Sequence, residues 1–528
     1  MKGTLFYKFS FKVYNKEVII CWEEMMMDKK TEAQFFQLLK EASLLKEAYY
    51  LADWDSQTGM PEKSSSYRAE MSGYLNELIF AKENGQEMTE MIDYFSCHQE
   101  ELSEFGQQVF KKVKEEYDRN HRIPSKDWAE YNKLVAQGHA LWVEAREKKD
   151  FSILEPLMTK MVAQLKNFIP LWQKDEKTPY DVLLNQYEPG LTVEELDRIF
   201  PVVRQGIMAI IKTLKEKGTE PAHDFLHRYV KKEDQQAFVK AVVSRLGYDF
   251  SKGRLDDTVH PFMQELNRDD ARITTRWNEH DVMFAVLGVM HEAGHGTYEQ
   301  NIDKKYDYTP FSGGVSMGIH ESQSLFNELI IGANKEFWRQ VYPLFQKDTQ
   351  GAFDDIDVDT FYRGVKFTQS SFIRIEADPL TYPLHIIIRY EIEKMLFNGD
   401  LQVKDLPKVW NDKYEEYLGI RPENDLEGVL QDVHWSSGLF GYFPSYALGF
   451  MYAAQLYYAM QKEFDMNEAF KRNELNRPSQ WLKEHIHRFG GSKTPHELIV
   501  DATHEPLNPQ YLLTFLKELY YDVYQVKE

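Results

Sequence analysis

The sequence predicts a mostly α-helical protein with one small β-sheet near residues 250–320. Amphipathic stretches, in which apolar residues recur at three- and four-residue spacing, fill most of the 528-residue chain. Strand-like alternation is scarce. Its best example is "RITTRW" at residues 272–277, where β-branched residues stand between polar stretches. We therefore expect helices to build the core and a short sheet to accompany them.

The expected helices follow one another with short connections. The first begins at Thr31-Glu32-Ala33-Gln34, which has the form of a capping box, and apolar residues then recur at helical spacing from Phe35 to Leu45. Further amphipathic stretches cover residues 70–82, 104–118, 128–148, 153–175, 193–216, 234–245, 281–300, 319–340, 382–397, 408–418, 446–462 and 511–525. We find no repeat and no obvious linker among them.

The first 26 residues do not fit this pattern. Their longest apolar run is "VIICW", and charges interrupt the rest, so they do not form a signal peptide. Met25, Met26 and Met27 supply alternative starts. We expect residues 1–26 to be a non-native N-terminal extension, which the intact mass of the natural protein would test.

Composition excludes several classes of partner. The formal net charge is −21, and so acidic a surface repels phosphate backbones and disfavours nucleic-acid and membrane-surface binding. No apolar run approaches the ~18 residues that a membrane span needs. The two cysteines, Cys21 and Cys97, lie in no CxxC pattern and are best read as free thiols in a reducing compartment. We therefore expect a cytoplasmic protein.

The stretch "VMHEAGHGTYEQ" at residues 289–300 contains an HExxH motif. On a helix, His291 and His295 lie on one face a turn apart, where both imidazoles can reach one zinc ion. Glu292 stands beside the first of them, close enough to take a proton from a water molecule at the metal. The apolar helical setting argues against a chance surface pair, so we predict a metal site.

The third ligand has to come from elsewhere. Glu299 lies on the same helix face as His295, but each four-residue step rises ~6 Å, so three groups on one straight helix cannot meet at one ion. A metzincin site would need a histidine six residues beyond His295, where this chain has Asn301.

A second helix can supply it. The stretch "MGIHESQSLFNELIIGANKEFW" at 317–338 follows the Gly-rich "FSGGVSMG", and Glu321 lies 26 residues after His295, far enough for the chain to return. A site of two His and one Glu with an open position is the hydrolytic type, so we choose Glu321, with His320 as a competing ligand. Glu328 lies two turns further along and can orient a ligand histidine.

These motifs resemble the carboxypeptidase Taq family of thermostable metallocarboxypeptidases. "HEAGHGTYEQ" and "GIHESQS" are accompanied, in matching order, by "HPF" at 260–262, "DARITT" at 270–275, "IRIEAD" at 373–378, "GVLQDVHW" at 428–435 and "FGYFPSYALG" at 440–449. The resemblance runs from about residue 30 to the C-terminus. One local departure is His504, where a glycine is expected.

The resemblance implies a large, mostly helical metallopeptidase fold with a deep substrate groove. It further implies a cytoplasmic homodimer that removes single residues from the free C-termini of peptides with zinc, or sometimes cobalt. His434 and Tyr446 lie in matching blocks as oxyanion donors, with Tyr442 as a competitor for the tyrosine's role.

A carboxypeptidase must also bind a free α-carboxylate, for which arginine is suited by its planar fork. Arg374 in "IRIEAD" is the first choice, and Arg272 and Arg421 are rivals, although Asp270 can pair with Arg272 instead. His260 is expected to line the groove, and Asp378 to support Arg374 or a site histidine. His485 and His487 lie two apart, which on a helix separates the rings, so we interpret them as non-metal.

Two other functions remain open. A neutral oligopeptidase of similar fold would cut internal bonds and would still cleave a C-terminally amidated peptide. A non-catalytic peptide-binding protein would require a damaged site, whereas no ligand or base is missing here. An aminopeptidase would be expected to carry an acidic amine-binding motif, which we do not find.

Overall fold

The computed structural model describes residues 16–527, and for residues 16–30 it describes only the helical backbone. Part of the expected N-terminal extension, residues 1–15, therefore lies outside the described residues. Throughout the described part the chain is helical apart from one small sheet, which confirms the predicted fold class.

The first half of the chain forms nine α-helices among the described residues. Their bounds are α1 Lys16–Thr58, α2 Ser65–Asn84, α3 Gln86–Cys97, α4 Glu104–His121, α5 Ser125–Lys148, α6 Glu155–Trp172, α7 Pro179–Leu184, α8 Val193–Lys217 and α9 Lys232–Leu246. The expected start at Thr31 is wrong, because α1 runs through this position. Glu32 instead accepts hydrogen bonds from the backbone N–H and the hydroxyl of Ser103, the residue that caps α4.

Three strands follow, β1 Leu255–Asp257, β2 Met263–Asn267 and β3 Asp270–Thr275, in the order β1-β3-β2. β1 is parallel to β3, and β2 is antiparallel to it, with Ile273 opposite both Leu255 and Met263. Ala271 and Ile273 are fully buried on the face that packs against α10. The sheet therefore supports the helix that carries the HExxH motif.

The second half of the chain returns to helix. Its elements among the described residues are α10 Val282–Gln300, α11 Met317–Leu325, the π-helical turn η6 Phe326–Ile331, α12 Lys335–Asp348, α13 Val358–Val365, α14 Tyr382–Asn398, α15 Leu406–Leu418, α16 Pro444–Gln461, α17 Met466–Lys471, α18 Arg477–His485, α19 Pro495–Thr503 and α20 Gln510–Val523. Short 3-10 turns connect them, including η9 Trp435–Ser437. His504 adopts the left-handed conformation, φ 66°, that a glycine at this helix end would favour.

The single helix expected over 319–340 is wrong, because the chain forms α11, η6 and α12 in its place. The Asn334 side chain accepts a hydrogen bond from the N–H of Phe337 at 2.9 Å and so starts a new helix. This cap satisfies an N–H that would otherwise bond within a continuous helix. The interruption separates Glu321 and Glu328 from the amphipathic helix α12.

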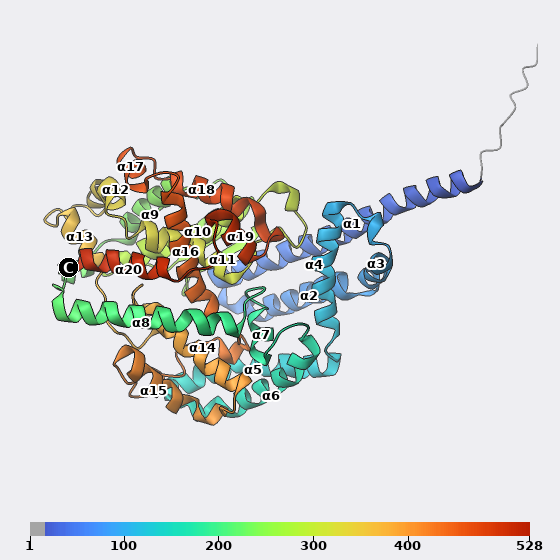
Figure 1. Ribbon diagram of the computed structural model, residues 1–528, viewed down its shortest axis with the longest axis horizontal. Helices are drawn as coiled ribbons and strands as arrows, with labels where there is room; N and C mark the ends of the chain where they lie inside the picture. Colours follow the sequence, from blue (N-terminus) through green and yellow to red (C-terminus); the bar gives the residue numbers. More distant parts are fainter. Residues whose placement is uncertain (1–15, 528) are drawn as a thin grey trace, which may run out of the picture.

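Figure 1 shows how these elements are arranged. Helices α5, α6, α14 and α15 lie in the lower part of the view, and α9 to α12 with α16 to α19 lie in the upper part. α8 and α20 pack side by side between the two groups, and α1 to α4 form the right-hand side of the molecule. Among them, α16 is apolar around most of its circumference, and it packs against α11, α14 and α20.

Candidate metal centre

Helix α10 presents His291, Glu292 and His295 from the centre of the molecule. Asp281 caps the helix by accepting a hydrogen bond from the N–H of Phe284, and the first two turns are apolar and mostly buried. Glu292 is 8% exposed. The motif therefore lies in the interior, on a helix supported by the sheet, as its apolar setting predicted.

Helix α11 packs against α10 and brings Glu321 to the two histidines. Glu321 Oε2 lies 3.8 Å from His291 Nε2 and 3.6 Å from His295 Nε2. One ligand atom from each residue lies within 4.8 Å of the other two. Atoms 2.0–2.2 Å from a tetrahedral zinc ion are roughly 3.3–3.5 Å apart, so this donor set fits such an ion with small adjustments.

Two glycines allow the ligand helices to approach so closely. A Cβ at Gly294, inside the HExxH motif, would lie 2.3 Å from the backbone oxygen of Gln323 and 2.6 Å from Ser324 Cα. A Cβ at Gly449 on α16 would lie 2.5 Å from Cγ of Glu321. Helix α10 therefore approaches the backbone of α11, and α16 approaches the Glu321 side chain, each at a glycine that leaves no room for a larger residue.

Gly294→Ala is expected to weaken both metal binding and stability, because the new methyl group meets backbone atoms that cannot rotate away. Overpacking of this kind costs ~1–3 kcal/mol. Gly288→Ala on the same helix is the matched control, since nothing lies within 4 Å of its Cβ position. It should be neutral or stabilising by up to ~1 kcal/mol. Chelator competition and thermal unfolding measure both effects, and equal behaviour of the two variants would contradict the packing argument.

Each ligand histidine uses its other ring nitrogen for a protein partner. His291 Nδ1 lies 2.7 Å from Glu328 Oε2, as the position of Glu328 two turns beyond Glu321 suggested. His295 Nδ1 lies 2.6 Å from His320 Nδ1. Both Nε2 atoms are thereby left to face Glu321. This is the usual arrangement in which a partner fixes the tautomer of a metal-binding histidine.

His320 is thus a neighbour of His295, and it is not one of the three converging residues. Its Nε2 lies 2.8 Å from Oε1 of Glu299, which is 3% exposed and also accepts a hydrogen bond from the N–H of Gly314. If His295 Nδ1 donates to His320 Nδ1, His320 carries its proton on Nε2 and donates to Glu299. Sequence reasoning missed this role of Glu299, although its position four residues beyond His295 was a signal.

Burial and neighbouring charges shift the pKa values of the three side chains on α10 in different directions. Burial alone would lower the pKa of His291, but Glu321 and Glu328 outweigh it and raise that pKa to about 10. Burial lowers the pKa of His295 to about 3, and burial raises the pKa of Glu292 to about 7. Carboxylates that hold a proton on His291 this strongly would equally stabilise a divalent cation.

His434 and Tyr446 lie together beside this centre. His434 Nε2 is 3.2 Å from the Tyr446 hydroxyl oxygen, and burial lowers the pKa of His434 to about 4, so the ring is neutral at pH 7. Burial raises the pKa of Tyr446, and Glu321 is among the charges that add to this effect. Burial and the charge of Glu321 raise the pKa of Tyr442, and its hydroxyl group contacts the sulfur of Met317. His434 and Tyr446 are therefore both neutral at pH 7.

Arg374 is 5% exposed and lies in the 3-10 turn η7 Arg374–Glu376. Its Nε and one terminal nitrogen contact Asp432 Oδ1 at 2.9 and 2.7 Å. The guanidinium carbon also lies 4.9 Å from the centre of the Tyr446 ring. Among the arginines considered from the sequence, Arg374 is the one whose contacts lie among the residues of the site.

The contacts of the two rival arginines lie elsewhere. Arg272 pairs with Asp270 at 2.7 Å, as the sequence spacing suggested, and stacks over Trp54 of α1. Arg421 is exposed and pairs with two carboxylates of α15. His260 is an exposed residue of the loop between β1 and β2.

The structure differs from what the sequence suggested for Asp378 and for the pair His485 and His487. Asp378 supports neither Arg374 nor a histidine among its observed partners, because its carboxylate accepts hydrogen bonds from backbone N–H groups of Gln369, Leu380 and Thr381. His485 and His487 do not share one helix, since α18 ends at His485. His487 Nε2 contacts Oε1 of Gln323 at 2.9 Å, and neither ring belongs to the metal-type cluster found among residues 31–527.

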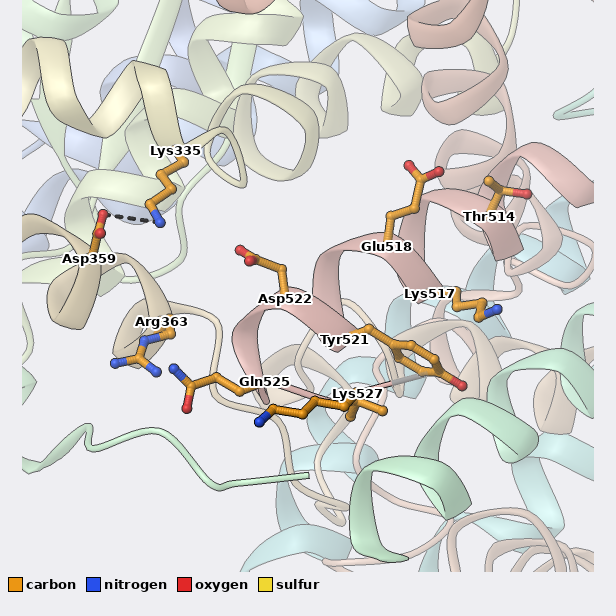
Figure 2. A pocket seen from close by; sticks show the side chains of 11 residues that line it. Lys335, Asp359, Arg363, Thr514, Lys517, Glu518, Tyr521, Asp522, Gln525 and Lys527 are labelled. Carbon is orange, nitrogen blue, oxygen red and sulfur yellow. Dashed lines mark ion pairs between the residues drawn. The ribbon is translucent and has the colours of Figure 1, made fainter. Parts of the chain in front are cut away.

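A second pocket lies between α12, α13 and α20, away from this centre (Figure 2). Its walls carry charges of both signs, and Lys335 pairs with Asp359 at 3.1 Å. None of the residues of the metal centre lines it. Because opposite charges alternate there and no catalytic group converges, the metal centre is the better candidate site.

Comparison with known proteins identifies a metallopeptidase family, which implies a metal ion. The family model described as "Carboxypeptidase Taq (M32) metallopeptidase" matches residues 34–520. Carboxypeptidase 1 of Bacillus subtilis is 45% identical over 93% of this chain and 98% of its own length. Thermostable carboxypeptidase 1 of Thermus thermophilus is 33% identical over 93% of this chain and 99% of its own.

Solved structures agree in fold. The M32 carboxypeptidase of Deinococcus radiodurans superimposes with a TM-score of 0.91 at 32% identity, covering 94% of this chain and 100% of that one. In the part of the chain that the structure describes, no helix combines the length and apolarity needed to cross a membrane.

Proposed function

The chain belongs to the carboxypeptidase Taq (M32) family of metallopeptidases, and from this premise we propose that it hydrolyses single amino acids from the C-termini of peptides. The observation that carries the proposal is the convergence of His291, His295 and Glu321 beside the buried carboxylate of Glu292. Residues 27–528 would act as one catalytic unit. The substrate would bind in a groove that exposes this centre.

We further propose that the metal is zinc, with cobalt as a second ion that the same ligands accept. Two imidazoles and one carboxylate are the donor set of hydrolytic zinc sites with an open position. Bound there, a divalent ion would polarise the scissile carbonyl and lower the pKa of a water molecule. Elemental analysis of the purified protein, together with reconstitution by each metal, tests this assignment.

The residues of the chain would supply the remaining chemistry. Glu292 takes the proton of the attacking water and returns it to the leaving amine, a role for which a pKa near neutrality is suited. His434 and Tyr446 donate hydrogen bonds to the oxyanion that forms when the carbonyl is attacked. His434 is neutral and Tyr446 keeps its proton at pH 7, so each carries one hydrogen. In the structure one of the two donates to the other, and this bond would open when both bind the oxyanion.

Arg374 would bind the free α-carboxylate and so direct cleavage to the C-terminus. It shares Asp432 with Arg389, whose side chain is fully buried and lies 2.6 Å from the other carboxylate oxygen. Two guanidinium groups and one carboxylate leave a net charge of +1. A substrate carboxylate would compensate this charge, which is the physical basis for preferring a free C-terminus.

Arg374→Ala is expected to lower kcat/KM for a peptide with a free C-terminus by about 30- to 4,000-fold, since removing one partner of a buried charge pair costs ~2–5 kcal/mol. Arg374→Lys keeps the charge and loses the planar fork, so it should also be impaired, by less. The measurement compares an N-terminally blocked peptide with its C-terminal amide. The wild-type enzyme should refuse the amide.

Arg421→Ala is the matched control, because that guanidinium is exposed and bound to surface carboxylates. Cleavage of the amide by the wild-type enzyme at a comparable rate would favour a neutral oligopeptidase. If the amide is refused and Arg374→Ala is unimpaired, the carboxypeptidase assignment stands and the carboxylate is bound by Arg272 or Arg421. Absence of any turnover with bound metal would favour a peptide-binding protein.

Assembly and location follow from the same resemblance. We propose that the chain acts in the cytoplasm as a homodimer and contacts peptides, with neither nucleic acid nor membrane among its partners. The net charge of −21 supports the exclusion of nucleic acid. Light scattering during gel filtration measures the oligomeric state, and cell fractionation measures the location.

A further inference from the structure

Arg374 has few donors left for a substrate. Its Nε and one terminal nitrogen are bound to Asp432, so the side of the guanidinium that usually forms a bidentate pair is already occupied. The backbone N–H of Arg374 and the guanidinium of Arg389 both donate to Gln431 Oε1, which holds this cluster rigidly. A substrate carboxylate therefore meets only the remaining terminal N–H groups of a nearly buried arginine.

Tyr382 stands at the open end of this guanidinium. The other terminal nitrogen of Arg374 donates to the Tyr382 hydroxyl oxygen at 2.5 Å. Tyr382 is the first residue of α14 and is only half-buried, whereas Arg374 is 5% exposed. The hydroxyl group therefore lies against the terminal nitrogen of Arg374 that Asp432 leaves free.

The proton of this hydroxyl group has no acceptor among the contacts found within residues 31–527. In the one hydrogen bond found for this hydroxyl group among those residues, its oxygen accepts from Arg374. A hydroxyl that accepts from a cation is polarised and becomes a stronger donor. Burial raises the pKa of Tyr382, so the proton stays in place at neutral pH.

The ring is held in position independently of its hydroxyl. It stacks on Phe450 with ring centres 5.3 Å apart and meets the edge of Tyr446 at 6.2 Å. Removing the oxygen should therefore leave the ring where it is.

We propose that the Tyr382 hydroxyl group donates the second hydrogen bond to the C-terminal carboxylate of the substrate, next to Arg374. Tyr382 is then a specificity-determining residue that extends the buried positive charge to the substrate. This inference rests on the proposed carboxypeptidase function. No proton is transferred, and the group acts only by binding the carboxylate.

Tyr382→Phe tests the proposal. Its kcat/KM for an N-blocked peptide with a free C-terminus should fall about 10- to 100-fold, the range for losing a hydrogen bond to a charged group. N-acetylphenylalanine, which carries the same carboxylate, should bind more weakly by a similar factor. The corresponding amide should bind wild type and variant alike, and zinc content should not change.

Tyr390→Phe is the matched control. Tyr390 lies two turns further along α14, and its hydroxyl donates to Asp197 at 2.7 Å, away from Arg374. This variant loses the same oxygen from the same helix and should keep the wild-type affinity for N-acetylphenylalanine. A loss common to both variants would indicate a disturbed helix and would overturn the specific role.

The double variant Arg374→Ala with Tyr382→Phe tests whether the two residues bind the same carboxylate. If both bind one carboxylate, the double variant should lose little more than Arg374→Ala alone, because the effects are not additive. If Tyr382→Phe stays within twofold of wild type in both kcat/KM for the peptide and affinity for N-acetylphenylalanine, the inference is wrong. The carboxypeptidase assignment would then stand unchanged. Equal cleavage of free acid and amide by the wild-type enzyme would instead remove the proposed function itself.

Discussion

Glu292→Gln should retain the metal and lose nearly all turnover. The amide has the shape of the carboxylate but cannot accept a proton from water. A general base typically contributes ~10²–10⁴-fold, so kcat should fall by at least this range. Glu292 is not one of the three converging ligands, which is why zinc content should stay close to one ion per chain. Steady-state kinetics and elemental analysis of the same sample provide the measurement.

Glu292→Asp is the matched variant, because it keeps the carboxylate and withdraws it by one methylene group. It should retain more activity than Glu292→Gln while still falling below wild type. A Glu292→Gln enzyme with near-normal kcat would show that another group accepts the proton. Loss of zinc from Glu292→Gln would show that the residue supports the ligands and that its kinetic effect is indirect.

Glu321→Ala should abolish activity by leaving an incomplete donor set. Two imidazoles alone hold a divalent ion much more weakly than two imidazoles and a carboxylate, so the purified variant should contain little metal. Removal of the metal from the wild-type protein by a chelator should have the same effect, and added zinc, the proposed metal, should reverse it. The helical structure should persist in both cases, because the core extends far beyond this site.

Glu328→Gln is the comparison for this experiment. It keeps an oxygen that can accept a hydrogen bond from His291, so metal affinity should fall by only ~10–100-fold and excess zinc should restore turnover. A Glu321→Ala protein with full activity would contradict its assignment as a ligand. Equal losses for both variants would indicate that Glu321 acts through the histidines and is not a ligand.

Much of the architecture was predictable from local pattern. Helical periodicity identified most of the helices, and the β-branched run at 272–277 identified the sheet. One prediction was wrong where a side-chain hydrogen bond overrides helical periodicity. At Asn334 such a bond caps α12 and so divides the helix expected over 319–340. The predictions missed six helices of 6 to 12 residues, because so few turns give little periodic signal. They are α3, α7, α13, α17, α18 and α19.

The sequence by itself determined that His291 and His295 face one site, because a helix turn of about 5.4 Å places residues four apart on one face whatever surrounds them. It also predicted Glu292 as the base. Spacing and the matching motifs also indicated Glu321, and the structure brings it to the pair. Only the tertiary structure decided which groups act on these residues from far along the chain. Arg374 meets Asp432 across 58 residues, and His320 meets His295 across 25. Such contacts depend on how helices pack, and packing depends on the whole set of side-chain volumes and close glycine contacts, which no local pattern encodes.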